Sequence, residues 1–229
     1  RMEFTAAAPA YSFTVTNGAT FTINSTIDSS SPSLPAFAVN TGATLTIGDT
    51  ADVPIGSLTD GPAGGGTVVI APSSFAFLTI AGGTSSTFSG SFAGGGSLEL
   101  GNTSTTLTLT GASNGGNIGT IGGDLSLCDC YAGGLNISGG MLTVASGFGV
   151  SVFGGTLSVI DGGRLEIANN LGIASTVAIS GAGSTVTVGG ITFVSSPVGP
   201  ATLSISNGGV LNSQGGAQLD GFFDVATVT

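Results

Sequence analysis

The chain has 229 residues, 42 of them glycine, and carries a net charge of −10 with two basic residues and no histidine. So few basic residues exclude binding to the phosphates of nucleic acid or to an anionic membrane surface, and the lack of histidine excludes catalysis by serine–histidine or cysteine–histidine pairs. No run of about 18 apolar residues occurs, so we expect no direct membrane insertion of this segment.

The first ten residues, RMEFTAAAPA, lie outside the pattern that fills the rest of the chain. RMEF resembles a cloning remnant, and TAAAPA resembles the small-residue region around a signal-peptide cleavage site. Both origins stay open. We treat residues 1–10 as a remnant and N-terminal tail, and residues 11–229 as a single domain that is a fragment of a longer secreted chain.

A short template then recurs along the chain. SFTVTNGATFTIN (residues 12–24) and AFAVNTGATLTIG (residues 36–48) place Phe13 and Phe37 at equivalent positions. Leu157 and Leu203 are equivalent in the same way in GTLSVIDGGRLEI (residues 155–167) and ATLSISNGGVLNS (residues 201–213). Their separation along the chain is nearly twice that of Phe13 and Phe37. One period in the low twenties at both ends of the chain predicts units that bury their apolar residues by stacking.

The segments between these copies have the same strand-and-turn character. Apolar residues recur at every second position, as Leu107 and Leu109 do in TTLTLTG, and almost never with helical spacing. Threonine, valine and isoleucine favour extended backbone, while glycine, asparagine and aspartate suit the bends between short strands. The sequence therefore predicts an all-β fold.

Two all-β arrangements fit the template. Asp-Gly-Gly and Asn-Gly-Gly between alternating segments are typical of hairpins, which favours an antiparallel sandwich. A sandwich, however, gives no reason for copies at multiples of about 23 residues, whereas the coils of a parallel β-helix (a solenoid) do. We predict a parallel β-helix of roughly 8–11 coils with inward Leu157.

Two parts of the chain resemble repeats of autotransporter passenger domains. The residues of TFSGSFAGGGSLELGNTSTTLTLTG that match the autotransporter-associated β-strand repeat are Phe88, Gly90, Gly94, Leu98 and the run 107–111, while Phe92 stands where the pattern has isoleucine. Residues 156–209 are similar to a second passenger repeat built around G-x-L-x-I-x-N-G-G and S-G-A-G-S. The resemblance implies a right-handed parallel β-helix that a Gram-negative bacterium secretes across its outer membrane to the cell surface.

The only two cysteines, Cys128 and Cys130, lie in LCDCYAGG. They are too few for a zinc site, and their spacing is not that of a C-x-x-C redox motif. In a secreted chain we expect the two to form a small disulfide ring. Free thiols are the alternative, because alternate residues of an extended strand lie near the upper limit for bridging.

Other residues offer little chemistry. Ser184 has no histidine to activate it, the glycine-rich calcium motif is missing, and Arg164 is the one interior basic residue. We expect no enzyme activity, no cofactor and no metal. Asn17 and Asn207, and likewise Thr22 and Thr46, recur at equivalent template positions, which predicts ladders of stacked polar side chains on the surface.

Three functions remain for such a chain. The first is an adhesive segment at the bacterial surface that binds a host cell or matrix, glycans or another copy of itself. The second is a passive stalk that holds a functional domain encoded elsewhere in the full-length protein. The third, an enzyme or secreted effector, is disfavoured because the required side chains are missing.

Overall fold

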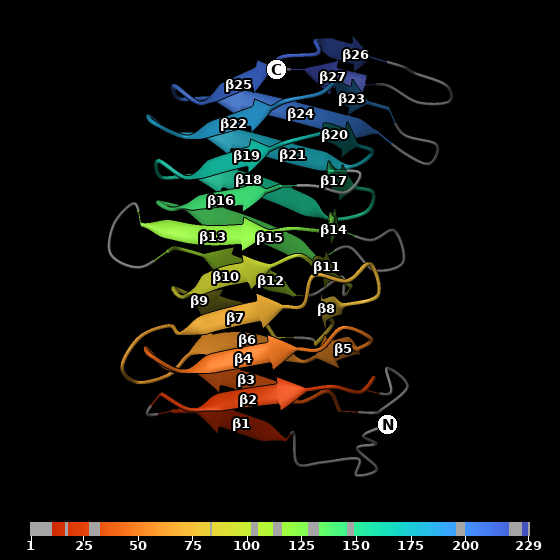
Figure 1. Cartoon of the computed structure of the whole chain (residues 1–229). Helices are drawn as coiled ribbons and strands as arrows, with labels where there is room; N and C mark the ends of the chain where they lie inside the picture. The colour runs from red at the N-terminus through yellow and green to blue at the C-terminus, as the bar shows by residue number, and fades with distance from the viewer. Residues whose placement is uncertain are drawn as a thin grey trace.

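The chain folds into a parallel β-solenoid, as a computed structural model shows (Figure 1). The structure describes residues 11–16, 18–27, 33–82, 84–101, 105–111, 116–127, 133–145, 149–195, 200–219 and 226–228. These residues contain strands and turns but no helix, and they complete about eight turns. The predicted all-β class and coil number are confirmed.

Each turn contributes to three faces, which run the length of the solenoid (Figure 1). The nine-strand face consists of β2 (Thr20–Ile23), β4 (Thr44–Ile47), β7 (Thr67–Ile70), β10 (Ser91–Gly94), β13 (Asn117–Ile121), β16 (Met141–Val144), β19 (Arg164–Ile167), β22 (Thr185–Val188) and β25 (Val210–Ser213). The eight-strand face consists of β5 (Asp52–Ile55), β8 (Phe77–Ile80), β11 (Ser97–Leu100), β14 (Leu125–Leu127), β17 (Gly149–Val152), β20 (Asn170–Ile173), β23 (Thr192–Val194) and β26 (Ala217–Leu219).

The third face is built from two sheets. The shorter consists of β1 (Ser12–Val15), β3 (Ala36–Val39) and β6 (Ser57–Asp60). The longer consists of β9 (Ser86–Phe88), β12 (Thr106–Leu109), β15 (Gly134–Ser138), β18 (Thr156–Ile160), β21 (Thr176–Ser180), β24 (Ala201–Ser206) and β27 (Ala226–Val228). Strands β6 and β9 lie side by side where the two sheets meet.

Every strand pairs in parallel with the strand one turn away. Phe13 lies opposite Phe37, whereas Leu78 lies opposite Leu98 after a shorter step along the chain. The longest step between described strands joins Leu107 to Leu135. The parallel pairing excludes the antiparallel sandwich, and the unequal steps explain why the repeat in the sequence is ragged: loops of different length leave the strand register intact.

The turns are right-handed. In Figure 1 the nine-strand face runs from left to right at the front, and the chain returns behind it while rising from the N- to the C-terminus. This is the hand that twisted strands and their crossover connections favour.

Apolar side chains at alternate positions point into the solenoid. Leu157 is fully buried and is stacked between Leu135 and Val177 on the neighbouring turns. Its predicted inward orientation is confirmed. Burial of one such side chain contributes about 1.5–3 kcal/mol, so the interior column is the main source of stability.

The corners use left-handed backbone, as the turn residues predict. Asp161 and Asn207 are the described non-glycine residues with positive φ, at 53° and 51°. Each is followed by a glycine that is also left-handed, Gly162 or Gly208. The Asp-Gly-Gly and Asn-Gly-Gly sequences thus make corners between two faces of one turn, and not hairpins.

Candidate functional site

Outward hydroxyl groups form rows on the nine-strand face. Thr20 lies opposite Thr44, and Thr44 opposite Thr67. The hydroxyl of Thr67 is 3.3 Å from that of Ser91 on the next strand. Because parallel strands are about 4.8 Å apart, these hydroxyls repeat at that interval along the solenoid.

The predicted polar ladders are present only in part. Thr22 and Thr46 lie directly opposite each other on β2 and β4 and both face outward. Asn207 lies at an exposed corner near the other end, where its Nδ2 donates to the Ser180 hydroxyl at 3.1 Å. Asn17 lies outside the described residues, so its place in a polar ladder stays a prediction.

The third face carries a comparable set of polar groups. Thr156 and Thr176 lie opposite each other in one outward row. In the neighbouring rows, Asn136 Nδ2 donates to the Thr108 hydroxyl at 3.5 Å, and the Ser206 hydroxyl donates to that of Ser180 at 3.1 Å. Two faces therefore present hydroxyls and amides in strand register.

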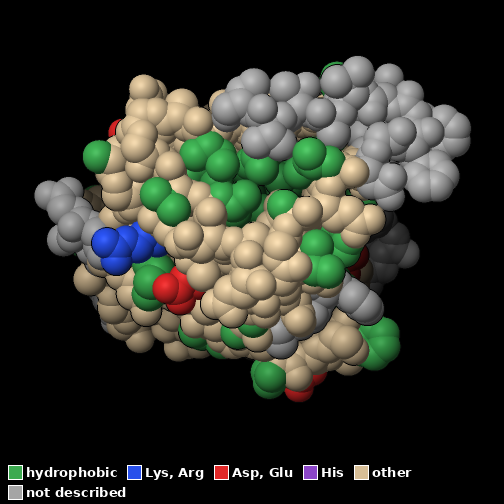
Figure 2. All heavy atoms as spheres, turned by 90° about the horizontal axis from the view of Figure 1, so that it is seen from above, with side chains coloured by type: hydrophobic (Ala, Val, Ile, Leu, Met, Phe, Trp, Pro, Cys, Tyr) green, Lys and Arg blue, Asp and Glu red, His purple; other side chains and the backbone are tan. Residues whose placement is uncertain are grey.

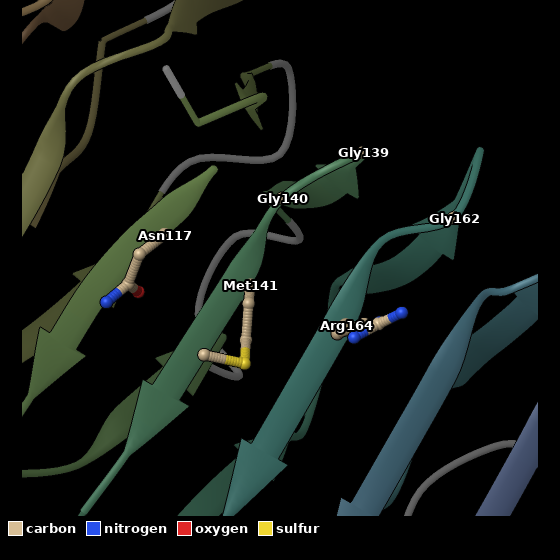
Figure 3. A pocket seen from close by; sticks show the side chains of 6 residues that line it. All are labelled: Asn117, Gly139, Gly140, Met141, Gly162 and Arg164. Carbon is tan, nitrogen blue, oxygen red and sulfur yellow. The ribbon is translucent and has the colours of Figure 1, made fainter. Parts of the chain in front are cut away.

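Arg164 is the first residue of β19, and it faces outward among the polar rows of the nine-strand face. Its side chain is exposed, and it carries the one positive charge of the described residues. A shallow depression of about 300 Å³ lies on one side of it, and Figure 3 shows the side chains that line it on three strands and their corners. The lining residues are Asn117, Gly139, Gly140, Met141, Gly162 and Arg164.

A second depression of about 280 Å³ lies on the opposite side of the same side chain. Its lining residues are Arg164, Leu165, Glu166, Gly183, Thr185 and Thr187. Glycines at the corners leave both hollows open, since they carry no side chain to fill them. The sequence singles out Arg164 as its one interior basic residue but does not indicate Met141 or Asn117 as its neighbours. Their place follows from the register between turns, in which Asn117 lies opposite Met141 and Met141 opposite Arg164.

Ser184, the second serine of the S-G-A-G-S pattern, is fully buried. Its hydroxyl donates to the Ser180 carbonyl at 2.8 Å and accepts from the Gly162 amide at 3.1 Å. The second bond joins corners of neighbouring turns, so this serine holds the backbone and offers no reactive hydroxyl.

Metal ligands and cysteines add no further site among the residues described. No group of three or more cysteine, aspartate or glutamate side chains in that part of the chain is placed to hold a metal ion. Cys128 and Cys130 lie outside it, and their pairing stays a prediction.

Long apolar helices that could cross a bilayer do not occur in the described ranges.

Comparisons with protein families, with curated proteins and with solved structures give no match for this chain.

Proposed function

We propose that the chain is an adhesive segment of a secreted surface protein, and that it binds through many weak polar contacts along the solenoid. The observation that carries the proposal is the alignment of hydroxyl groups on two faces, such as Thr20, Thr44 and Thr67 on one and Thr156 and Thr176 on the other. Each hydrogen bond to a partner is weak, but repetition raises the effective concentration of the remaining contacts.

The proposed setting is the surface of a Gram-negative bacterium, reached by the route of autotransporter passengers. Support comes from the repeat patterns of residues 87–114 and 156–209 and from the solenoid that the chain forms. The proposed partners are a host cell surface or matrix, glycans, or a second copy of the chain. Nucleic acid is disfavoured by the net charge of −10.

We also propose that the segment is not an enzyme. The sequence has no histidine. The two depressions beside Arg164 are shallow, and Glu166 is the single acidic side chain that lines them. General acid–base catalysis needs paired groups within hydrogen-bond reach of a substrate, which this arrangement does not offer.

A passive stalk is the second candidate. The unbroken succession of nine parallel strands on one face favours it, because such a stack makes a rigid spacer. The two candidates differ in one measurable respect: an adhesive surface loses attachment when its outward hydroxyls are removed, and a stalk has no attachment to lose.

The experiment uses beads coated with the chain and measures their attachment to host cells and their clumping. One variant replaces Thr20, Thr44 and Thr67 on the nine-strand face by valine, and a matched variant replaces Thr106, Thr156 and Thr176 on the third face. Valine keeps the shape and strand preference of threonine and has a methyl group in place of the hydroxyl. A six-fold variant combines both sets.

Each triple variant is expected to attach less than the parent, and the six-fold variant less than either, with an unchanged melting temperature because all six side chains point outward. Attachment of the six-fold variant equal to that of the parent would place adhesion elsewhere. Attachment of the parent no greater than that of uncoated beads would favour the stalk.

A further inference from the structure

Arg164 is a charged side chain without an internal partner. No hydrogen bond or ion pair joins its guanidinium to any other described residue, and Glu166, two positions further along the same strand, is not within ion-pair distance. A guanidinium group forms strong, often bidentate hydrogen bonds with a carboxylate. Here the five N–H donors stay available to a ligand.

The neighbours of Arg164 provide different chemistry on its two sides. Met141 lies opposite it on β16, half-buried, and gives an adaptable apolar surface (Figure 3). Thr185 lies opposite it on β22, and Thr187 lines the same hollow. A ligand at this point therefore meets an apolar patch, a planar cation and hydroxyl groups in sequence.

We propose that Arg164 is the centre of a binding site for a carboxylate-bearing sugar, such as an isolated uronic acid unit of an otherwise neutral polysaccharide. The guanidinium fork matches a planar carboxylate through two parallel hydrogen bonds. The ring hydroxyls of that sugar bond to Thr185 and Thr187 in the hollow on their side of Arg164, and the apolar C–H face of the adjoining sugar unit packs on Met141 in the other hollow. The two depressions, of about 300 and 280 Å³, are at the lower limit of ligand-pocket volumes, so each suits one ring.

The surrounding charge favours a singly charged ligand. Glu166 follows Arg164 by two positions and Asp161 precedes it at the corner. With a net charge of −10, the chain repels a phosphate or sulfate dianion more strongly than a carboxylate. This inference deepens the adhesion proposal, on which it rests for its cell-surface setting, and names one ligand class for it.

The sequence permits a direct measurement at this side chain. Arg1 and Arg164 are its only two arginines. The arginine Nε–H region of a nitrogen-15 NMR spectrum therefore holds at most two signals, and R164Q assigns the one that belongs to Arg164. Methyl galacturonoside is the probe; methyl galactoside, inorganic phosphate and N-acetyl-glutamate amide are the comparison ligands.

The galacturonoside is expected to shift the Arg164 signal saturably, and the neutral galactoside to leave it in place. R164K keeps the positive charge but loses the planar guanidinium, and its affinity for the galacturonoside is expected to fall about tenfold. Because this variant has no Arg164 signal, its binding is measured by saturation transfer to the ring protons of the sugar. E166Q removes a carboxylate roughly 7 Å away along the strand, which at low salt is expected to strengthen binding about two- to threefold.

Three results overturn the site. An equal shift with the neutral galactoside removes the role of the carboxylate. Tighter binding of phosphate than of the galacturonoside would contradict the preference for a singly charged ligand. Equal binding of N-acetyl-glutamate amide would show that the sugar ring is not recognised and would favour an acidic peptide as the ligand. Bead attachment separates the two proposals. If beads coated with R164K still attach although this variant does not bind the galacturonoside, the adhesion proposal holds and the sugar site is not what carries adhesion. If the parent binds the galacturonoside but none of the coated beads attach, the sugar site holds and the adhesion proposal fails.

Discussion

The two ends of the solenoid close their interiors differently. At the first turns, Phe13, Phe21 and Phe37 form an aromatic cluster with ring centroids 5.1–5.8 Å apart. At the last turn of the nine-strand face Leu211 holds the inward position of Phe21, and two other inward positions near this end are polar. Ser213 lies above Val188, and the buried Thr192 donates a hydrogen bond to the Ser213 hydroxyl at 3.0 Å.

Exposure follows this difference. Phe37 is 1% exposed, whereas Leu219, in the inward column of the eight-strand face, is 59% exposed. Figure 2 shows apolar side chains gathered over the middle of the C-terminal end. An inward position therefore stabilises the fold only to the extent that neighbouring turns cover it, as expected for a stack with nearest-neighbour interactions.

The largest expected effect contrasts the middle of the column with its end. Leu157→Asp places an unpaired charge between Leu135 and Val177 and is expected to lower the free energy of unfolding by about 4 kcal/mol or more. Leu219→Asp is expected to change it by less than about 0.5 kcal/mol, because that side chain is already in contact with water. Urea denaturation measures both; equal losses would show that the end is as well covered as the middle.

The second contrast concerns the aromatic cluster. Phe37→Ala removes a fully buried ring that contacts two others and is expected to cost about 3–5 kcal/mol. Leu211→Ala, at a half-covered position of the last turn, is expected to cost about 1 kcal/mol. Melting temperatures of the two variants test the ranking, and a greater loss at Leu211 would contradict it.

Close backbone packing gives the third contrast. Gly119 has a φ of 107°, and a side chain there would overlap the Phe92 carbonyl oxygen on the adjacent strand. Gly119→Ala is expected to cost about 2–4 kcal/mol through strain and overlap. Gly216, with a φ of 90° and open space around it, carries only the strain, so Gly216→Ala is expected to cost about 1 kcal/mol. Chemical denaturation of the pair tests whether the middle is the tighter region.

The smallest effect is a pH dependence in the early turns. Partial burial raises the pKa of Asp52, whose position on β5 is covered by the neighbouring strand at Phe77. A raised pKa means that the folded state binds the proton more tightly than the unfolded state, so ionisation opposes folding. The stabilisation from the protonated form is complete below the unfolded pKa of 3.8 and is lost as the pH rises through the folded value.

Asp52→Asn is therefore expected to be slightly more stable than the parent at pH 7, and the difference should vanish near pH 3. Asp52 is only partly buried, so the difference is small, and melting temperatures in matched buffers measure it. A variant less stable than the parent at pH 7 would contradict the direction of the shift.

Particular residues show how far sequence reasoning extends. The period-2 pattern placed Leu157 inward, and the turn chemistry placed Asp161 and Asn207 at corners. The match of Thr22 with Thr46 followed from the spacing of the first two template copies. The site around Arg164 was not predicted, because the step from one turn to the next varies in length and so hides which side chains become neighbours.

The sequence by itself determined that the chain alternates apolar and polar residues in short strands, bends at glycine, asparagine and aspartate, and repeats often enough to stack. These properties are local, because they depend on backbone preferences and on side-chain alternation within a few residues. Only the tertiary structure decided which outward side chains share a face, where Arg164 meets Met141 and Thr185, and how well each inward residue is covered. These depend on the register between turns, which the hydrogen bonds of neighbouring strands set and which loop lengths do not reveal.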